Sequence, residues 1–315
     1  MEEIRKKVII DTDIGDDIDD LFTLYLAASL KEIELIGVTT VYGNTNLRAR
    51  QVNKFLSLSN LKDVKVYAGC GKQLKSLHPL PINHVFCQYG QELDDESLKP
   101  INEDENCEGT SAVDYLIESA KKYKEELTIV CIGPLTNLAK AIMKNKNAMR
   151  KCNIVLMGGC YSKIEKEWNI ECDYKAAKIV FDAKLNITAV GVDVTKKTEI
   201  SAKLQKQILN TSKDEYINYL VTCCNRWFNV SGRRIILHDP LALYSIVDTE
   251  LLKYKHYHVC VETKGKHSIG LTIPMEELLW VQFKYINKEK FSVVRCASKV
   301  NGNKFIEVFK NQLGF

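Results

Sequence analysis

The chain has 315 residues, 45% hydrophobic and 27% charged, so it can bury a large core and is not a disordered protein. Its 44 basic and 40 acidic residues give a net charge of +4, too small to indicate a nucleic-acid partner. The sequence shows neither a long apolar span nor a secretory signal, which predicts a cytoplasmic protein without a membrane partner. The eleven cysteines follow no framework or zinc-ligand spacing, which predicts free, reduced thiols.

Short apolar runs alternate with amphipathic stretches over the first two thirds of the chain. In chain order the pattern predicts strand 8–10, helix 21–30, strand 33–40, helix 47–58, strand 64–67, helix 110–123, strand 127–132, helix 135–145, strand 154–157, helix 174–183 and strand 187–192. Nearly continuous apolar strands separated by helices are typical of a parallel sheet covered on both faces. The predicted fold class is therefore α/β, with one open, mostly parallel, doubly wound sheet.

The last third of the chain has a different pattern. Helices are predicted at 215–230 and 238–247, and short strands at 254–263, 268–274, 280–286 and 291–296. These strands predict a small antiparallel appendage over residues 254–296. Residues 71–109 lack periodicity and contain three prolines, as expected of a lid or binding loop. No internal repeat is present, so residues 1–315 are predicted to form a single domain.

Six aspartates lie between residues 11 and 20, in the segment DTDIGDDIDD directly after the first predicted strand. The carboxyl end of a strand is where open α/β sheets bind ligands. Neighbouring carboxylates repel one another unless a cation holds them, and Ca²⁺ accepts about six to eight oxygen ligands. Gly15 permits a tight turn, and Asp19 and Asp20 would lie at the start of the following helix.

Three other interpretations of this loop stay open at this point. The loop could be a solvated acidic segment with a helix cap. Asp11 and Asp13 form the DxD pattern of a phosphotransferase with a nucleophilic aspartate, although Gly15 stands where that pattern expects threonine or valine. An EF-hand fits poorly, because the aspartate spacing differs and the twelfth position is not glutamate.

A second polar motif, His238-Asp239-Pro240, follows an apolar run and opens a predicted helix. Asp239 is either the cap of that helix or a metal ligand. His238 is either a surface histidine or a proton donor held beside a cation site.

Two further motifs follow predicted strands. In Glu167-Trp168-Asn169, the polar side chains can hydrogen-bond a polyhydroxylated ligand, or the segment is a helix start capped by Asp173. Residues 133–137 (GPLTN) break one strand and begin a helix. A backbone carbonyl at that point can face a metal, or the segment is a plain turn.

In this order, the motifs resemble those of the inosine/uridine-preferring nucleoside hydrolase family. The matching segments are DTDIGDDIDD at 11–20, VTTVYGN at 38–44, IGPLTN at 132–137, MGG at 157–159, EWN at 167–169 and HDP at 238–240. The resemblance spans roughly residues 5–250. It implies the nucleoside hydrolase fold, calcium-dependent hydrolysis of the N-glycosidic bond of a ribonucleoside, a role in nucleoside salvage, and a homo-oligomer that is a dimer or a tetramer.

The resemblance also implies roles for individual residues. The metal ligands are Asp13, Asp20, the backbone carbonyl of Ile132 and Asp239. The residues that bind ribose hydroxyls are Asp19, Asn44, Glu167 and Asn169. The Ca²⁺ ion would hold the ribose diol and the attacking water, and Asp13 would take the proton of that water as general base. His238 would protonate the leaving base, and members with histidine there tend to accept inosine and uridine.

The chain departs from the family pattern around these residues. Ile14 replaces a proline, and the acidic loop is two residues longer, so that either Asp17 or Asp19 fills the ribose-binding position. Asp19 and Asp20 are favoured because the helix from Leu21 onward then aligns without a gap. Candidates to stack on the base, each with a core position as its alternative, are Trp168, Trp227, Phe228 and Tyr89.

Two departures concern the substrate. The segment between Gly159 and Glu167 is short and lacks the family's sugar-binding asparagine, and residues 71–109 lack the usual histidine–glycine motif. They motivate the alternative that the enzyme cleaves a modified nucleoside, such as a queuosine-type 7-deazaguanine nucleoside. A non-catalytic nucleoside- or sugar-binding protein and a phosphatase with Asp11 as nucleophile are the remaining alternatives.

Overall fold

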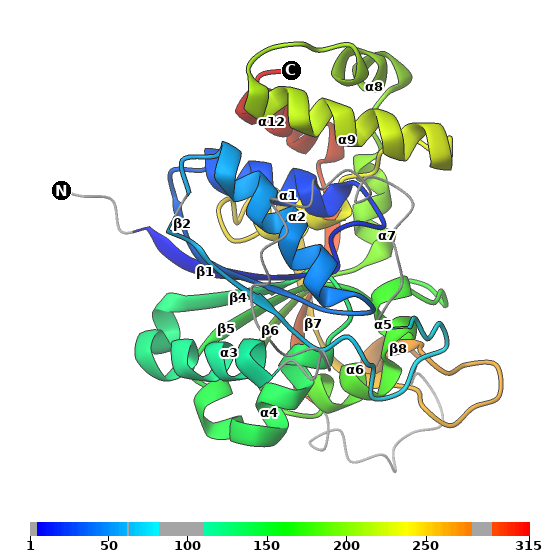
Figure 1. Ribbon diagram of the computed structural model, residues 1–315. Coiled ribbons are helices and arrows are strands. Elements are labelled where there is room, and N and C mark those ends of the chain that lie inside the picture. The colour runs from blue at the N-terminus through cyan, green and yellow to red at the C-terminus, as the bar shows by residue number, and fades with distance from the viewer. Residues whose placement is uncertain (1–4, 62, 82–109, 279–291) are drawn as a thin grey trace.

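The computed structural model describes residues 5–61, 63–81, 110–278 and 292–315. Its strands form a single sheet in the order β3-β2-β1-β4-β5-β6-β9-β7-β8 (Figure 1). The strands are β1 (Lys6–Thr12), β2 (Ile33–Thr40), β3 (Lys65–Ala68), β4 (Leu127–Cys131), β5 (Asn153–Met157), β6 (Asn186–Val190), β7 (Leu252–Val261), β8 (Thr272–Pro274) and β9 (Ser292–Val300).

The helices connect these strands and cover the sheet. They are α1 (Asp19–Ser29), α2 (Thr45–Leu58), α3 (Thr110–Tyr123), α4 (Thr136–Met149), α5 (Trp168–Cys172), α6 (Tyr174–Phe181), α7 (Val192–Thr195), α8 (Ala202–Leu209), α9 (Glu215–Ser231), α10 (His238–Tyr244), α11 (Met275–Leu278) and α12 (Gly302–Leu313). Two short 3₁₀ helices are η3 (Lys124–Glu126) and η4 (Lys196–Thr198).

The sheet has a hydrophobic core on each face. In β1, Val8 and Ile10 pack into one core cluster and Ile9 into the other, as the two-residue period of a strand requires. Helices α1 and α2 lie on one face and α3 and α4 on the other (Figure 1). The strands from β3 to β9 in this order pair in parallel. The predicted doubly wound α/β fold is therefore confirmed.

The antiparallel C-terminal part is also confirmed. Strand β7 pairs antiparallel with both β8 and β9. Strand β9 in turn pairs in parallel with β6, so these strands extend the main sheet. The short apolar runs of the last third predicted strands. The pairing of β9 with β6, however, joins segments more than a hundred residues apart in the chain. The predicted strand 280–286 lies outside the described residues, and the division into domains stays a prediction.

The sequence pattern missed the helices α5, α7, α8, α11 and α12. Helix α12 buries Phe305, Phe309 and Leu313, which are four residues apart and form one helical face. Phe309 packs edge-on against Phe22 of α1, with ring centroids 5.2 Å apart. Figure 1 shows α8, α9 and α12 together on the outer side of α1. The four-residue spacing was thus the available signal for α12.

Several smaller predictions concern what the described residues contain. The cysteines there are free, as predicted. Among the described helices none has the length and apolar character needed to cross a bilayer. Of the predicted lid 71–109, residues 82–109, including Tyr89, lie outside the described residues. Residues 74 and 75 donate their backbone N–H groups to Asp173, which anchors the described start of this segment.

The strand order reverses between β1 and β4, because β2 and β3 lie on one side of β1 and β5 and β6 lie beyond β4. In an open α/β sheet the chain leaves two such strands toward opposite faces, and a crevice forms beyond their carboxyl ends. Asp11 and Cys131 are paired near that end of β1 and β4. The acidic loop and the GPLTN motif therefore leave the sheet side by side.

Candidate active site

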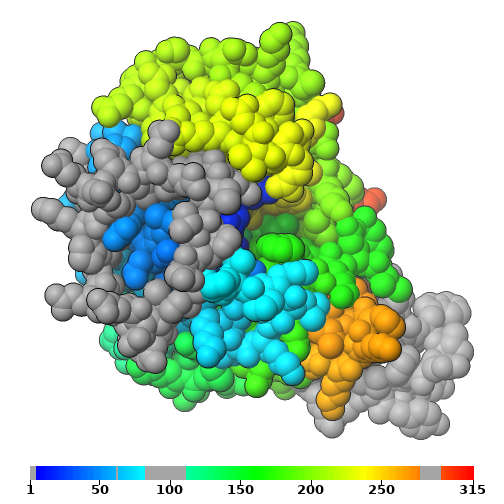
Figure 2. Space-filling model, turned by 45° about the vertical axis from the view of Figure 1, so that its right-hand side comes forward, coloured from blue at the N-terminus to red at the C-terminus, as the bar shows by residue number. Residues whose placement is uncertain are grey.

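A pocket of about 590 Å³ lies beyond the carboxyl ends of β1, β4 and β5. The predicted site residues that line it are Asp13, Asp17, Asp19, Asp20, Ile132, Glu167, Trp168, Asn169, His238 and Asp239. Figure 2 shows this face hollowed between the yellow end of α9 and the cyan segment after β3. Segments separated by more than two hundred residues therefore converge on a single cavity.

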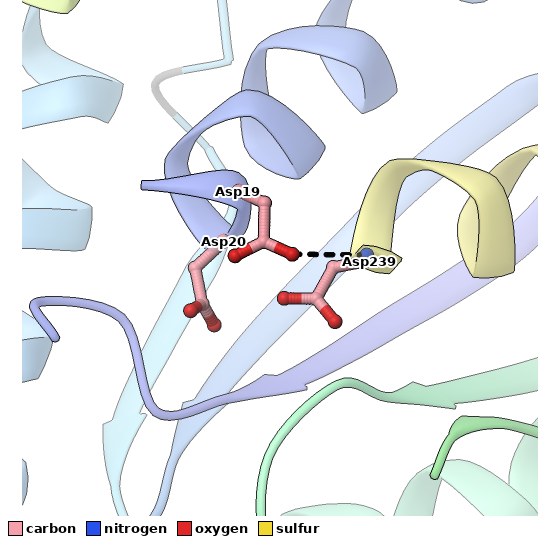
Figure 3. A group of neighbouring side chains, drawn as sticks. All are labelled: Asp19, Asp20 and Asp239. Carbon is pink, nitrogen blue, oxygen red and sulfur yellow. Dashed lines mark hydrogen bonds between the residues drawn. The ribbon is translucent and has the colours of Figure 1, made fainter. Parts of the chain in front are cut away.

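The most buried charged residues that line the pocket are three aspartates. Asp19 and Asp20 begin α1 and Asp239 lies at the start of α10, and their side chains point toward one another (Figure 3). One oxygen from each lies within 4.8 Å of the others, and all three residues are buried. The backbone N–H of Asp239 donates to Asp19 Oδ2 at 3.2 Å. This hydrogen bond ties the two helix starts together.

Burial, followed by repulsion from neighbouring aspartates of the acidic loop, raises the pKa of Asp19, Asp20 and Asp239 well above the usual range of a carboxyl. Within the described part of the chain, none of the three forms a salt bridge with lysine or arginine. A group of buried oxygen donors without a protein cation is the donor set that a hard divalent ion prefers. The cluster therefore fits a metal ion.

Asp13 and Ile132 lie beside this cluster, just beyond the ends of β1 and β4. A Cβ on Gly133 would lie 2.7 Å from Asp13 Oδ1, so the glycine of the GPLTN motif makes room for this carboxylate. Burial is the main cause that raises the pKa of Asp13 to about 7. The Ile132 carbonyl accepts a hydrogen bond of 2.9 Å from Asn169 Nδ2.

A buried arginine that sequence analysis missed holds the turn after Asp13. Arg48 on α2 is fully buried and donates to the carbonyl oxygens of Tyr42 at 2.7 Å and Ile14 at 2.8 Å, and to that of Asp13. Its Nη2 also donates to Asp16 Oδ2 at 2.8 Å. Nothing in the helical pattern of residues 47–58 distinguished this arginine from a surface one.

Two adjacent aspartates of the lengthened loop both have arginine partners. Asp16 pairs with Arg48, and Asp17 Oδ2 accepts a hydrogen bond of 3.2 Å from Arg233 Nη2. The backbone N–H of Ile14 donates to Thr12 Oγ1 at 3.0 Å, a contact that a proline at this position could not make. The departures from the family pattern are therefore accommodated by contacts within this chain.

Asp11 does not fit the role of a phosphatase nucleophile. Its side chain is fully buried and is absent from the residues that line the pocket in the described structure. Asp11 Oδ1 accepts hydrogen bonds from Thr39 Oγ1 at 2.6 Å and from Asn137 Nδ2 at 2.7 Å. The side chain of Asn137 also bonds Thr40 and Cys70, so it holds the ends of neighbouring strands together. Sequence analysis did not assign this role to Asn137.

Glu167 and Asn169 are held rigidly at the start of α5. The Glu167 carboxylate accepts hydrogen bonds from the backbone N–H groups of Asn169 at 2.9 Å, Gly159 at 3.0 Å and Ile170 at 3.2 Å. Burial raises its pKa to about 7. Asn169 Nδ2 donates to the carbonyls of Ile132 and Met157, which leaves its Oδ1 as the acceptor for a ligand.

Asp173 caps α6 by accepting from the backbone N–H of Ala176 at 3.0 Å, so the predicted cap is confirmed. The same carboxylate accepts from Thr136 Oγ1 and from the backbone of Leu74 and Lys75. It therefore joins α4, α6 and the segment after β3 behind the pocket.

His238 lines the pocket beside Asp239. Its Nδ1 lies 2.6 Å from Thr195 Oγ1 at the end of α7. Burial, with smaller effects from Lys196 and Arg233, lowers the pKa of His238 to about 4, so the imidazole is neutral at pH 7. Sequence analysis missed these two cations and Lys166, all of which line the same pocket.

The predicted aromatic residues occupy different places. Trp168 is 53% exposed at the pocket and stacks on His78, with ring centroids 4.4 Å apart and planes 20° apart. Trp227 is buried in the core and Phe228 packs against it, as their core alternative predicted. Asn44 caps α2 by accepting from Leu47 N at 3.0 Å and is not among the described residues of the pocket. Its role in sugar binding stays a prediction.

The sequence model of one protein family, the inosine-uridine preferring nucleoside hydrolases, matches residues 8–307, which is nearly the whole chain. The chain belongs to this family. Uridine nucleosidase 1 of Arabidopsis thaliana is 33% identical over 274 residues, which cover 83% of this chain and 80% of that relative. A plant nucleoside hydrolase, PpNRh1, superimposes with a TM-score of 0.79 at 26% identity, covering 98% of both chains.

A purine-preferring ribonucleoside hydrolase from Gardnerella vaginalis superimposes with a TM-score of 0.76 at 29% identity, again covering 98% of both chains. As a nucleoside hydrolase, the protein is an enzyme that cleaves N-glycosyl bonds of ribonucleosides. The family depends on a metal, and the buried aspartate cluster could hold one. These similarities do not favour the modified-nucleoside alternative or a non-catalytic binding protein.

Proposed function

We propose that this nucleoside hydrolase uses Ca²⁺ to hydrolyse the N-glycosidic bond of a ribonucleoside and releases free base and ribose. The observation that carries the proposal is the cluster of Asp19, Asp20 and Asp239, whose oxygens approach within 4.8 Å although all three residues are buried. Three such carboxylates repel strongly without a cation, and oxygen donors favour calcium over softer metals.

The proposed protein ligands are Asp13, Asp20, Asp239 and the Ile132 carbonyl, with Asp19 available at the same cluster. Asp13 and Ile132 come from the adjacent ends of β1 and β4, and the aspartates come from two helix starts. When bound, the ion would supply Lewis-acid activation of a water and an anchor for vicinal hydroxyls.

Asp13 is the proposed general base, because it lines the pocket and its carboxylate forms no salt bridge with lysine or arginine among the described residues. One of its oxygens would take the proton of the attacking water. As the bond to the base breaks, positive charge develops on the sugar ring. The surrounding carboxylates stabilise that charge without moving, since hydrogen bonds to the backbone already orient Asp19 and Glu167.

Asp19, Glu167 and Asn169 are the proposed ribose-binding residues. Backbone N–H groups or carbonyls hold each of them, so that little side-chain entropy is lost when sugar hydroxyls bind. Asp17 and Asn44 are proposed as weaker contributors, because Asp17 pairs with Arg233 and Asn44 caps α2. The base would lie toward His238 and Trp168 at the outer part of the pocket.

The first nucleosides to test are uridine and inosine, since a histidine lines the proposed base side and one relative is named a uridine nucleosidase. Purified protein is treated with a chelator, dialysed and assayed for reducing sugar with and without added Ca²⁺. We expect chelation to abolish ribose release and Ca²⁺ to restore it. Binding to the native state should also raise the melting temperature in proportion to the logarithm of free Ca²⁺.

Mg²⁺, Mn²⁺ and Zn²⁺ serve as controls at matched free concentrations. Full activity in chelator would contradict metal dependence, and recovery with Zn²⁺ but not Ca²⁺ would contradict the choice of metal.

We also propose that the enzyme acts in nucleoside salvage as a dimer or tetramer in the cytoplasm. Light scattering at several protein concentrations tests the assembly, and a monomer at all concentrations contradicts it.

A further inference from the structure

Thr195 and His238 form a contact that the proposed reaction leaves unexplained. Thr195 ends α7 and is fully buried, and its Oγ1 lies 2.6 Å from His238 Nδ1. His238 begins α10, 43 residues later in the chain. The imidazole lines the pocket, so one ring nitrogen is engaged by the threonine behind it.

The burial of Thr195 decides which group donates in this contact. A hydroxyl has one hydrogen to donate, and in the described structure His238 Nδ1 is the acceptor found for it. If Nδ1 carried a hydrogen, the threonine hydrogen would be left buried without an acceptor, which is unfavourable. Thr195 therefore donates, Nδ1 accepts, and the ring hydrogen is on Nε2.

We propose that Thr195 is a positioning residue that holds His238 in the tautomer with its hydrogen on Nε2, which then donates a hydrogen bond to the departing base. This inference rests on the proposed function. When the N-glycosidic bond breaks, its electron pair leaves with the base, while the water oxygen bonds to the sugar carbon and Asp13 takes the water proton. A fixed donor stabilises the charge that develops on the base.

Thr198 provides a matched control within the same turn. It is also fully buried, and its Oγ1 donates to the Thr195 carbonyl at 2.7 Å. Thr198→Val therefore removes a buried hydroxyl next to Thr195 without removing the donor to His238. Thr195→Val removes that donor at nearly constant volume, and Thr195→Ser keeps it.

The kinetic test compares two substrates that differ in the need for help at the leaving group. Uridine releases a poor leaving group, whereas 4-nitrophenyl β-D-ribofuranoside releases a phenolate that needs no donor. We expect Thr195→Val to lower kcat/KM for uridine about 10- to 100-fold and for the nitrophenyl riboside less than about 3-fold. Thr195→Ser and Thr198→Val should keep the wild-type ratio of kcat/KM for uridine to kcat/KM for the nitrophenyl riboside.

The proposal would be overturned if Thr195→Val lowered kcat/KM equally for uridine and the nitrophenyl riboside. It would also be overturned if Thr195→Ser lowered the ratio of the two kcat/KM values as much as Thr195→Val does. A direct readout uses the wild-type protein labelled with ¹⁵N in histidine, with His238 assigned from a His238→Asn variant. Its nitrogen shifts should show the hydrogen on Nε2, and a hydrogen on Nδ1 would overturn the proposal. The spectrum tests the tautomer even if no nucleoside is cleaved, so failure of the proposed function is recognised separately.

Discussion

The two halves of the acidic loop differ in what surrounds their charges. Asp16 and Asp17 each contact an arginine, one buried at Arg48 and one exposed at Arg233. Asp19 and Asp20, only two residues further along, lie against Asp239 with their oxygens within 4.8 Å. Aspartates that are alike in sequence are therefore divided into a group with protein cations and a group suited to a bound cation.

The comparison indicates which carboxylates a metal would need. A carboxylate paired with arginine already has its charge balanced, and a metal ion would have to displace the guanidinium. The cluster with Asp239 has no such partner within the described residues, and its pKa values are raised by burial and repulsion. Loss of one aspartate should thus strongly affect activity and the Ca²⁺ response in the second group and only weakly in the first.

The largest predicted effect comes from Asp239→Asn. Loss of one anionic ligand should lower kcat/KM for nucleoside hydrolysis by about 10³-fold or more. It should also remove the Ca²⁺-dependent rise in melting temperature, while the metal-free protein gains stability because repulsion with Asp19 and Asp20 is relieved. Steady-state kinetics and calorimetry measure both.

Asp17→Asn is the matched control. Like Asp239→Asn, it removes one carboxylate charge that lines the pocket, but this carboxylate belongs to the arginine-paired group. Its kcat/KM should change less than about 10-fold, and its response to Ca²⁺ should persist. An equal loss of the Ca²⁺ response in both variants would break the distinction between the two groups.

The next effect concerns the arginines. Arg48→Met leaves Asp16 and three backbone carbonyls without their buried donor, and should destabilise the protein by about 3–5 kcal/mol. Arg233→Met removes a partner whose side chain is 61% exposed, and should change stability by about 0–1 kcal/mol. Urea unfolding of both variants measures the difference, and equal midpoints would contradict the role assigned to Arg48.

A third prediction is the pH dependence of the metal-free protein. Burial raises the pKa of Asp11, Asp13 and Glu167 to about 7, so the native state binds protons that the unfolded state releases above about pH 4. Their stabilising contribution is complete below that pH and is lost as the pH rises through 7. The melting temperature in chelator should therefore fall from pH 5 to pH 8.

His238 has the opposite effect on the pH dependence of stability at acidic pH, because its native pKa of about 4 lies below its usual value. The native state then binds fewer protons than the unfolded state between about pH 4 and 6.5, which lowers stability as the pH falls through that range. Saturating Ca²⁺ should reduce the loss of stability between pH 5 and 8, since metal binding competes with protons. A melting temperature that rises with pH in chelator would contradict the carboxylate assignment.

The smallest effect tests how far the site extends beyond the carboxylates. Asn44→Ala removes the cap of α2 and should cost about 1 kcal/mol. Asn301→Ala removes the same kind of cap from α12, far along the chain, and serves as the control. A rise in KM for Asn44→Ala alone would support the predicted ribose contact, and equal kinetics in both variants would limit Asn44 to capping.

Much of the fold followed from local patterns. Apolar runs such as Val8–Ile10 in β1 and the helices between them indicated a parallel sheet, and strands of this kind must be buried on both faces. Motifs at strand ends also indicated a shared site, because the carboxyl ends of parallel strands meet at one edge. The pairing of β9 with β6 had no local signal, since either neighbour would satisfy the same strand pattern.

The amino-acid sequence by itself determined that carboxylates, an amide and a histidine stand at element ends near residues 11–20, 167–169 and 238–240. Only the tertiary structure decided which aspartate lies beside which charge. Arg48 looks like an ordinary helical arginine until α2 packs over the acidic loop, and Thr195 has no visible role until α10 brings His238 to it. Electrostatic partners act over a few ångströms, and neighbours at that range are set by packing between segments distant in the chain.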